Sequence, residues 1–416
     1  MQTKLPRELL ATDAGQRADA ILRSCVHCGF CTATCPTYLL TGDERDGPRG
    51  RIYLIKSMLE GNPVSEHTQR HLDRCLTCRS CETTCPSGVQ YHQLLDIGRA
   101  EVDRRVPRPI VSRWLRRLML FWLPHRGRFR WLLRTGWLVR GVLPRSVQRK
   151  LPVRQRPQFT LPQPALQSEH HRSVLLLQGC VQDAATPNTN RALTRLLAEQ
   201  NIATITVASA GCCGALSHHL GAVERARVQM RHNIDAWWPY IEAGAEALLV
   251  SASGCGAELK QYGRLLQDDP AYADKASRLA ALVRDPSEWI EPTWLSTLSP
   301  SGGRGHRVAY HPPCTLQHGQ RITGAPETLL EAAGYQLVPV RDSHLCCGSA
   351  GTYSLLQPSF SEALLERKTA ALCAEKPDCI ATANIGCQLH IASATSLPVY
   401  HWLELLADAL PAEKRA

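Results

Sequence analysis

The sequence predicts a multidomain α+β protein, in which an α-helical N-terminal domain precedes two α/β modules with short parallel sheets. Three observations predict this architecture. The chain has 416 residues, which is too long for one ordinary domain. Its 18 cysteines fall into two groups, and each group contains an internal repeat. The first group lies among helix-like patterns, whereas the second lies among short apolar runs that alternate with amphipathic stretches.

These features divide the chain into four predicted parts. Residues 1–103 carry eight cysteines and three helix-like stretches, at 18–23, 51–59 and 91–99. Residues 104–168 form a basic, amphipathic spacer without cysteine. The remaining ten cysteines lie in two modules of similar pattern, predicted at 169–300 and 301–416.

The N-terminal cysteines form a duplicated run. The segment CVHCGFCTATCP at 25–36 recurs as CLTCRSCETTCP at 75–86, so the two runs start 50 residues apart. Both follow the pattern C-x2-C-x2-C-x3-C-P, with which bacterial ferredoxins bind 4Fe–4S clusters. The sequence therefore predicts a ferredoxin-type domain with two such clusters.

The spacing of each run also predicts which cysteines share a cluster. C-x2-C-x2-C wraps three thiolates around one cluster, and the proline directs the fourth cysteine to the other. We expect Cys25, Cys28, Cys31 and Cys85 to hold the first cluster, and Cys75, Cys78, Cys81 and Cys35 the second. Structural zinc needs neither the third close cysteine nor the proline. A disulfide framework is disfavoured because the N-terminal residues do not resemble a secretion signal.

A second repeat occupies the C-terminal half. Cys180, Cys212-Cys213-Gly214 and Cys255 recur as Cys314, Cys346-Cys347-Gly348 and Cys387. Strands are predicted at 173–177, 247–250, 307–310 and 379–382, with helices between them at 190–199 and 361–374. Because ligands of parallel sheets lie beyond the carboxyl ends of the strands, we expect the cysteines of each module to gather at one sheet edge.

The chemistry of these Cys-Cys-Gly modules stays open at this level. Each set of four cysteines could bind a further iron–sulfur cluster, hold a redox-active thiol pair, or be the remnant of such a site. Three residues after the last cysteine stand Glu258 and His390, which could be ligands, although an exposed polar residue is commoner there. Cys373 and Cys379 fall outside both patterns and are expected to be ordinary buried thiols.

The positive charge is concentrated in the spacer. The formal net charge is +11, but residues 104–168 hold sixteen Arg and Lys and no Asp or Glu, so the rest of the chain carries −5. Residues 113–122 and 129–142 mix basic and apolar residues as interfacial helices do. Such a segment could dock on an anionic membrane surface or on an acidic partner. Four Trp in the spacer could also stack on bases, but no recognised nucleic-acid-binding fold accompanies them, so no nucleic acid is expected.

The order of these motifs resembles that of the iron–sulfur subunits of respiratory flavin dehydrogenases, and most closely the glycolate oxidase (glycolate dehydrogenase) iron–sulfur subunits. The likeness covers nearly the whole chain and is carried by the segments at 25–38, 42–56, 73–92, 187–193, 233–239, 251–263, 313–320, 342–353 and 382–390. The related subunit of anaerobic glycerol-3-phosphate dehydrogenase shares the broad architecture and is the alternative. Some relatives, such as heterodisulfide reductase subunits, end each module in C-x-x-C, which this chain does not.

This resemblance implies a complex with two flavin-type subunits that carry FAD and oxidise glycolate to glyoxylate, and often D-lactate. The chain would relay electrons towards the quinone pool from a cytoplasmic position, peripherally attached to the inner face of the membrane. No apolar run is long enough for a spanning helix. No dinucleotide fingerprint is visible either, so no catalytic residue is expected on this chain.

Overall fold

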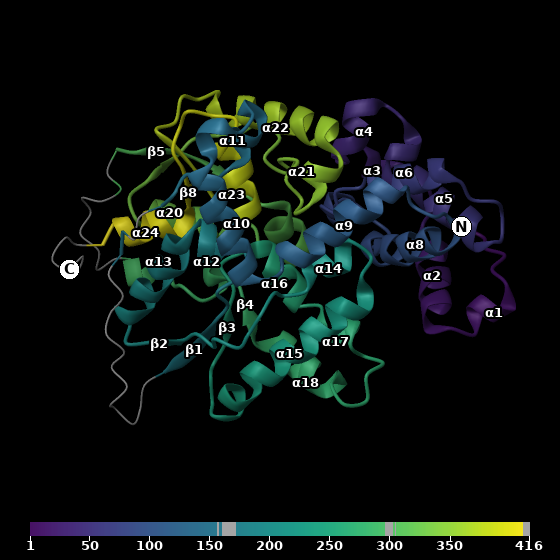
Figure 1. Ribbon diagram of the computed structural model, residues 1–416, viewed down its shortest axis with the longest axis horizontal. Helices are drawn as coiled ribbons and strands as arrows, with labels where there is room; N and C mark the ends of the chain where they lie inside the picture. Colours follow the sequence, from purple (N-terminus) through teal and green to yellow (C-terminus); the bar gives the residue numbers. More distant parts are fainter. Residues whose placement is uncertain (156–157, 160–171, 296–302, 304, 411–416) are drawn as a thin grey trace.

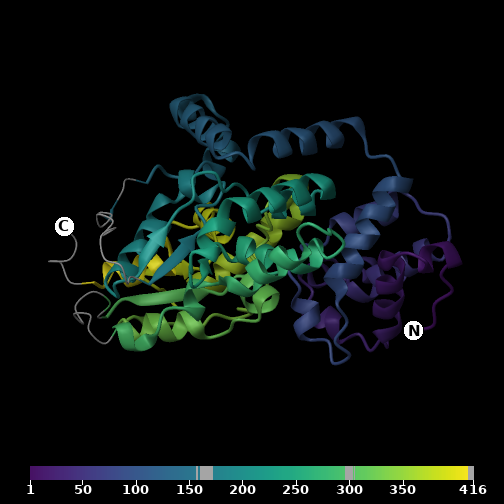
Figure 2. The same ribbon diagram turned by 90° about the horizontal axis from the view of Figure 1, so that it is seen from below.

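The computed structural model describes residues 1–155, 158–159, 172–295, 303 and 305–410. Figure 1 shows a helical N-terminal domain on one side of the molecule and the two α/β modules on the other. Two further helices, drawn in blue, lie along an outer edge of the molecule in Figure 2 and connect the two sides. The predicted fold class, a helical N-terminal domain followed by two α/β modules, is therefore confirmed.

Residues 1–105, all of which are described, contain helices and no strand. These elements are α1 (Arg7–Leu10), α2 (Asp13–Ser24), α3 (Phe30–Ala33), α4 (Pro36–Thr41), η1 (Glu44–Asp46), α5 (Pro48–Leu59), α6 (Glu66–Asp73), α7 (Ser80–Thr83) and α8 (Tyr91–Arg105). Helix α2 is capped by Thr12, whose Oγ1 accepts a hydrogen bond from the Gly15 N–H. Proline starts α4 and α5, where its missing N–H costs nothing.

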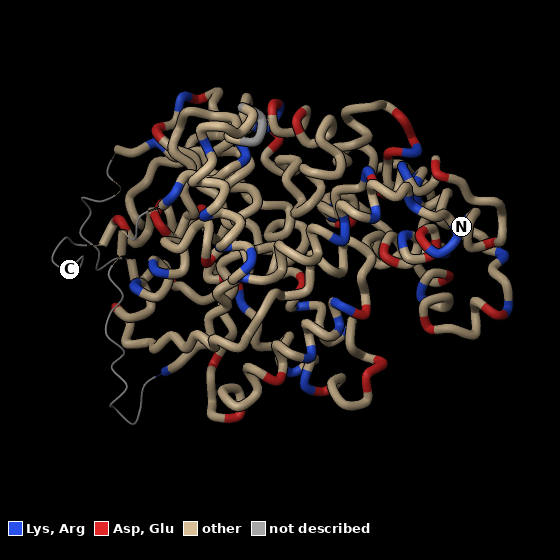
Figure 3. The backbone as a smooth tube through the Cα atoms, viewed as in Figure 1, with Lys and Arg blue, Asp and Glu red and all other residues tan. Residues whose placement is uncertain are grey.

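Helices α5 and α8 cross at close range in the core of this domain. Ile55 on α5 and Leu94 on α8 are fully buried. A methyl group on Gly98 of α8 would lie only 2.7 Å from Cγ1 of Ile55, so this crossing requires glycine. Charged residues of both signs intermix along the domain, as Figure 3 shows.

Between Ile110 and Lys150 the spacer consists mainly of helices, as its amphipathic pattern predicts. Its elements are α9 (Ile110–Trp122), α10 (Arg126–Leu138), η2 (Arg140–Val142) and α11 (Arg145–Lys150). Helix α9 ends before Pro124, and its Arg116 lies 3.5 Å from Asp73 of the N-terminal domain. Phe129 and Leu133 of α10 are buried together with Ala185 of the first module. The spacer therefore contacts both the N-terminal domain and the first module.

The two modules share one topology. Within the described residues, each contains a four-stranded parallel sheet, in the orders β2-β1-β3-β4 and β6-β5-β7-β8. The strands are β1 (Ser173–Leu176), β2 (Ala203–Ile205), β3 (Leu248–Leu249), β4 (Val283–Arg284), β5 (Arg307–His311), β6 (Gln336–Leu337), β7 (Cys379–Thr382) and β8 (Val399–His401). The central pairs β1–β3 and β5–β7 occupy equivalent places. The predicted parallel sheets are confirmed.

Helices separate the strands of each module. The first module contains α12 (Gln182–Ala185), α13 (Pro187–Ala198), α14 (Ala215–His219), α15 (Val223–Glu242), α16 (Ser253–Leu259), α17 (Tyr262–Leu265), α18 (Ala273–Leu282), η3 (Pro286–Glu288) and α19 (Pro292–Leu295). The second contains η4 (Thr315–Gln320), α20 (Ala325–Ala332), α21 (Tyr353–Leu356), α22 (Pro358–Cys373), α23 (Ile385–Ala392) and α24 (Trp402–Asp408).

The modules pack on each other through a common core. One apolar cluster contains Val174 and Leu176 of the first sheet, Val308 and Tyr310 of the second, and Trp402 of α24. Polar contacts accompany it, because Thr189 Oγ1 donates to Glu404 at 2.7 Å. The two modules are therefore one structural body with two copies of a cysteine-bearing edge.

Candidate iron–sulfur sites

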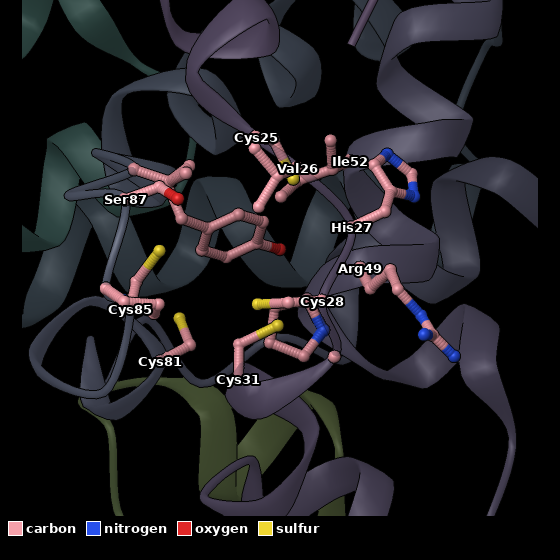
Figure 4. Close-up of a pocket in the computed structure, with 15 residues that line it drawn as sticks. Cys25, Val26, His27, Cys28, Cys31, Arg49, Ile52, Cys81, Cys85 and Ser87 are labelled. Atoms are coloured by element: carbon pink, nitrogen blue, oxygen red, sulfur yellow. The ribbon is translucent and has the colours of Figure 1, made fainter.

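The first cysteine run meets the end of the second run at one pocket. Figure 4 shows the sulfurs of Cys25, Cys28, Cys31 and Cys85 around a common space, with Cys81 beside them. Burial, followed by the charges of Cys25 and Cys85, raises the pKa of the Cys31 thiol to about 11. The structure thus brings together the four residues expected at the first cluster.

A second pocket lies beside the first and has the complementary set. It is lined by Cys75, Cys78 and Cys81 of the second run and by Cys35 of the first. Burial and the neighbouring thiols raise the pKa values of Cys78 and Cys81 well above the ordinary range of a thiol. The four residues expected at the second cluster are therefore also brought together.

Both runs bend in the same way around these pockets. The residues on either side of the second cysteine adopt left-handed backbone conformations, with φ of 56° and 86° at His27 and Gly29, and 55° and 61° at Thr77 and Arg79. Such turns point backbone N–H groups into a concave surface that suits an anionic group. A non-glycine residue in this conformation costs about 1–2 kcal/mol, so the second run accepts strain at two positions and the first at one.

The thiol chemistry of the two pockets fits an iron–sulfur cluster. Ligation requires thiolates, yet burial and the neighbouring thiols raise the pKa values of Cys31, Cys78 and Cys81, which keeps these three protonated when no cation is near. Cluster iron supplies the missing positive charge. At the second pocket the fully buried guanidinium of Arg51 adds to it, because its charge faces Cys75 and Cys35.

Arg51 belongs to a compact ion-pair network. The buried carboxylate of Asp46 lies 2.8 Å from Arg74 and 3.7 Å from Arg51, and it bonds Nδ1 of His71 at 2.7 Å. The geometry of Asp43, Asp46 and His71 would also allow a metal ion. The arginines already neutralise Asp46, so we assign this group a structural role in fixing Arg51 beside the second pocket.

The first Cys-Cys-Gly module gathers its four cysteines as predicted. Cys180 and Cys255 follow strands β1 and β3, and their thiols interact with the Cys212-Cys213 pair. Hydrogen bonds from Cys180 and Cys213 hold the pKa of the Cys212 thiol well below its usual range. In this module the Cys212 thiol therefore ionises readily, whereas the pKa values of Cys180 and Cys213 are raised well above the ordinary range.

The second module repeats this arrangement with different electrostatics. Cys314 and Cys387 follow β5 and β7, and Cys314 Sγ donates to Cys346 Sγ at 3.8 Å. The thiol of Cys347 interacts with those of Cys346 and Cys387. The hydrogen bond to Cys346, together with burial, raises the pKa of Cys314 well above the ordinary range. At Cys346 and Cys347 one thiol hydrogen bond lowers the pKa, but the bond with the next thiol and burial outweigh it and raise the pKa.

The second module adjoins the N-terminal domain directly at the second pocket. Cys78 packs against an apolar cluster that contains Cys314, Cys346 and Tyr353. Tyr353 Oη donates to the Arg74 carbonyl at 3.0 Å, and Thr83 Oγ1 is 2.9 Å from Nδ1 of His318. The second pocket therefore lies between the first pocket and the cysteines of the second module.

Neither of the two residues that stand three positions after the last cysteines is exposed, as was expected for them. Glu258 is buried rather than exposed, because it forms a 2.8 Å ion pair with His218. His390 is partly buried and its Nε2 lies 3.1 Å from Ser361 Oγ. Of the two thiols outside the patterns, Cys379 is buried as expected, whereas Cys373 is only half-buried.

One residue of the second module escaped the sequence analysis. His311, the last residue of β5, is 1% exposed, and its imidazole lies beside Cys347 and Cys387. The signal was present in the repeat itself. Three residues before its first cysteine, the first module has Leu177 where the second has His311.

Comparison with known proteins agrees with these sites. A family model for a 4Fe–4S dicluster domain matches residues 21–89, and a model for a cysteine-rich domain matches 174–260 and again 308–392. The chain is 51% identical over 413 residues to the glycolate oxidase iron-sulfur subunit of Escherichia coli K12, covering 99% of this chain and all of that protein.

More distant relatives share the architecture in whole or in part. The probable glycolate oxidase iron-sulfur subunit of Bacillus subtilis is 30% identical, with 94% of this chain and 93% of that protein covered. Lactate utilization protein A of Shouchella clausii is 27% identical over 53% of this chain and 90% of its own length. The glycerol-3-phosphate alternative is not favoured. The chain belongs to the family of glycolate oxidase iron–sulfur subunits.

Proposed function

We propose that this chain is the electron-transfer subunit of a complex that oxidises glycolate to glyoxylate. The observation that carries the proposal is the pair of adjacent four-cysteine pockets in a chain that is 51% identical, over its whole length, to a glycolate oxidase subunit. Oxidation of a 2-hydroxy acid releases two electrons, whereas an iron–sulfur cluster accepts one at a time. A protein with two clusters is therefore suited to divide the pair.

The cysteine ligands are part of the proposal. Cys25, Cys28, Cys31 and Cys85 hold one cluster, and Cys75, Cys78, Cys81 and Cys35 hold the other. The crossed arrangement is supported by Cys85, which lines the pocket of the first run, and by Cys35, which lines that of the second. Among these eight, Cys28 is exposed, whereas Cys78 packs against the second module.

This difference in exposure suggests a direction for the relay. Val26 and Phe30 flank the first pocket and are 65% and 61% exposed, so an apolar surface surrounds the site. A partner that docks there comes closest to the first cluster, and the second lies deeper in the molecule. We assign this surface to the flavin-type subunits, which carry FAD and the substrate site, with the quinone pool as the acceptor.

The spacer supplies the membrane contact in this proposal. On α9 the side chains of Ile110, Val111, Trp114 and Leu118 are each more than half exposed, between exposed Arg113 and Arg117. An apolar stripe flanked by arginines suits an anionic lipid surface. No helix in the described part of the chain is long and apolar enough to cross a membrane. The complex would attach peripherally at the cytoplasmic face.

Anaerobic co-purification with the flavoprotein subunits tests this function. The complex should reduce a dye in the presence of glycolate, and this chain should contain about eight iron atoms with matching acid-labile sulfide. The isolated, flavin-free chain should not oxidise glycolate. A chain saturated with zinc and lacking sulfide, or glycolate turnover by the isolated chain, would contradict the proposal.

A further inference from the structure

A polar cavity lies where the N-terminal domain meets both modules. Its volume is about 470 Å³, including its open mouth, which lies within the range of about 300–1,000 Å³ for small-molecule sites. The N-terminal domain lines it with Cys78, the first module with residues of α14 and α16, and the second module with Thr315 of η4. Cys78 also lines the second cluster pocket. The cavity therefore adjoins the deeper of the two cluster pockets.

Two histidines that line this cavity are each oriented by a carboxylate. On α8, Nδ1 of His92 lies 2.8 Å from Oε1 of Glu82. On α14, Nδ1 of His218 lies 2.8 Å from Oε1 of Glu258. A partner on one ring nitrogen fixes the role of the other nitrogen. Among the described residues, Nε2 of neither ring has a hydrogen-bond partner, since Asp96 is 3.7 Å from that of His218. Both Nε2 atoms are therefore available to a ligand.

A third histidine lines the same cavity. The ring of His219 stacks on that of His218, with centroids 5.6 Å apart. His219 is exposed, and its ring has no hydrogen-bond partner in the described part of the chain. A neutral imidazole offers one N–H donor and one acceptor nitrogen. The cavity thus collects three imidazoles from two sides of a domain boundary.

The charges that line the cavity oppose one another. Burial lowers the pKa of His218, but the carboxylates of Glu258 and Asp96 outweigh it, and the pKa rises to about 9. The imidazolium and the guanidinium of Arg79 therefore offset these two carboxylates. A site with many hydrogen-bonding groups and little excess charge suits a neutral polar molecule better than an ion.

A second cavity, of about 410 Å³ with its open mouth, adjoins the first and reaches helix α9. The two cavities share Asp96, His218 and His219, and the second is also lined by Arg116 of α9. The side chain of Arg116 is only 13% exposed, whereas that of Trp114 on the same helix is 66% exposed. The pair of cavities therefore extends from a cluster ligand to the inner face of the helix whose outer face carries the apolar stripe.

From these observations we propose that the cavity beside Cys78 binds the head group of a membrane quinone, with the imidazoles of His92, His218 and His219 as hydrogen-bond donors to its carbonyl oxygens. This inference rests on the proposed function, which supplies the electrons. Reduction of the quinone takes up two electrons from the relay and two protons, and its two carbonyl oxygens become the hydroxyl groups of a quinol. The protons come from solvent through the second cavity, along Asp96 and His218.

Photolabelling of the full chain tests the site directly. An azido derivative of ubiquinone should label the wild type in the segments that line the cavity, at 77–79, 218–219 and 254–261, and an excess of ubiquinone-1 should prevent the labelling. This readout needs neither glycolate nor the partner subunits. A complex that reduces a dye with glycolate, but whose chain is not labelled in a ubiquinone-1-sensitive way, would retain the proposed function and overturn the quinone site. Protected labelling confined to other segments would also overturn it.

Reoxidation of reduced clusters measures the same site in a variant. Full chain that has been reduced with dithionite and freed of the excess should be reoxidised by ubiquinone-1 at a rate that saturates. Ferricyanide, a small one-electron oxidant that needs no binding site, provides the reference rate. In His219→Leu the ratio of the quinone rate to the ferricyanide rate should fall by about tenfold, as expected for the loss of one hydrogen bond. His67→Leu, which replaces an exposed histidine on α6, is the matched control and should keep the wild-type ratio. An unchanged ratio in His219→Leu would contradict the proposal.

Discussion

The molecule contains two duplications that differ in how their copies are joined. The N-terminal runs exchange a cysteine, since Cys85 lines the pocket of the first run and Cys35 that of the second. The C-terminal modules each gather their own four cysteines. Copies that share ligands must remain alike, because a change in one disturbs both sites. Copies that hold separate sets are free to diverge.

The observed differences follow this rule. The N-terminal loops keep the same left-handed turns, even where Arg79 occupies the place of Gly29. The modules keep the same sheet order, yet Leu177 corresponds to His311, and only the second adjoins Cys78. Conserved topology with an altered side chain indicates that the sheet fixes where the cysteines lie, whereas single residues change their chemical surroundings.

The largest effect on cluster content is expected when a cysteine that one run contributes to the pocket of the other run is replaced. Cys85→Ser should abolish the cluster of Cys25, Cys28 and Cys31, so that iron and sulfide fall to about half while the other cluster stays intact. Electron paramagnetic resonance of the reduced protein would identify the signal that disappears. Cys373→Ser, outside every cysteine set, should change neither. Loss of the cluster of the second run alone would contradict the exchange.

A smaller effect should separate the two modules through their shared Cys-Cys-Gly turn. Gly214 and Gly348 have φ of 92° and 90°, so alanine costs about 1–2 kcal/mol at either position. A methyl group on Gly348 would also lie 2.6 Å from the Ser361 carbonyl oxygen, whereas one on Gly214 would lie 3.4 Å from that of Ala226. Overpacking should add about 1–3 kcal/mol in the second module only.

Thermal unfolding of the two alanine variants measures this difference. Gly348→Ala should have the lower midpoint, and Gly214→Ala should lie between it and the wild type. Gly244→Ala provides the control, because its φ is 97° but no atom lies within 4 Å of the added methyl group. Equal midpoints for Gly214→Ala and Gly348→Ala would show that the turns are packed alike.

The first module should depend on pH through its own histidine. Burial lowers the pKa of His218, but the carboxylates of Glu258 and Asp96 outweigh burial and the opposing charge of Arg264, and the pKa rises to about 9. Since the folded pKa lies above the unfolded value of about 6.5, the stabilisation is complete below pH 6.5. It is lost as pH rises through about 9, and amounts to about 3 kcal/mol.

The pH effect also reports on an interface, because Asp96 belongs to α8 of the N-terminal domain and Glu258 to the first module. The melting midpoint of His218→Gln should fall below that of the wild type at pH 6 and approach it at pH 10. The exposed His67→Gln, on α6, is the control and should behave as the wild type at both values. If the melting midpoints of His218→Gln and the wild type differ by the same amount at both pH values, the charge of His218 does not explain the difference in stability.

The sequence predicted where the cysteines of these sites lie better than it predicted the buried side chains around them. Cysteine spacing is local and repeated, so both duplications and the strands before Cys180, Cys255, Cys314 and Cys387 could be read directly. The partners of a buried side chain are set by tertiary packing. Glu258 is buried because it forms an ion pair with His218 of another helix in the same module. The periodicity of the sequence does not predict such a pair.

His311 illustrates the same limit. His311 lies at the carboxyl end of strand β5, whereas Cys347 lies in a loop and Cys387 in helix α23. Only the folded chain unites the three, although a comparison of the two repeats would have singled out the histidine against Leu177. Divergence between copies is therefore the signal that sequence analysis should add to their similarity.

The smallest effect on the two duplications is expected from substitutions on the outer face of the spacer, because this face is part of neither duplication. The inward-facing Arg116 pairs with Asp73, but Trp114 is 66% exposed between the exposed Arg113 and Arg117. We therefore expect the triple variant Arg113→Ala, Trp114→Ala, Arg117→Ala to keep all its iron. Its binding to anionic vesicles should weaken, since each arginine near such a surface contributes ~1 kcal/mol.

Sedimentation of the full chain with vesicles measures this contact. The wild type should bind anionic vesicles at low salt and neutral vesicles weakly, and 1 M salt should release it because the Debye length shrinks to ~3 Å. Arg104→Ala, which removes an exposed charge outside α9, is the control and should bind as the wild type does. If the wild type binds neither kind of vesicle at low salt, the stripe on α9 must face a protein. The arginines would then meet an acidic surface of the flavin subunits, and the triple variant should fail to co-purify with them.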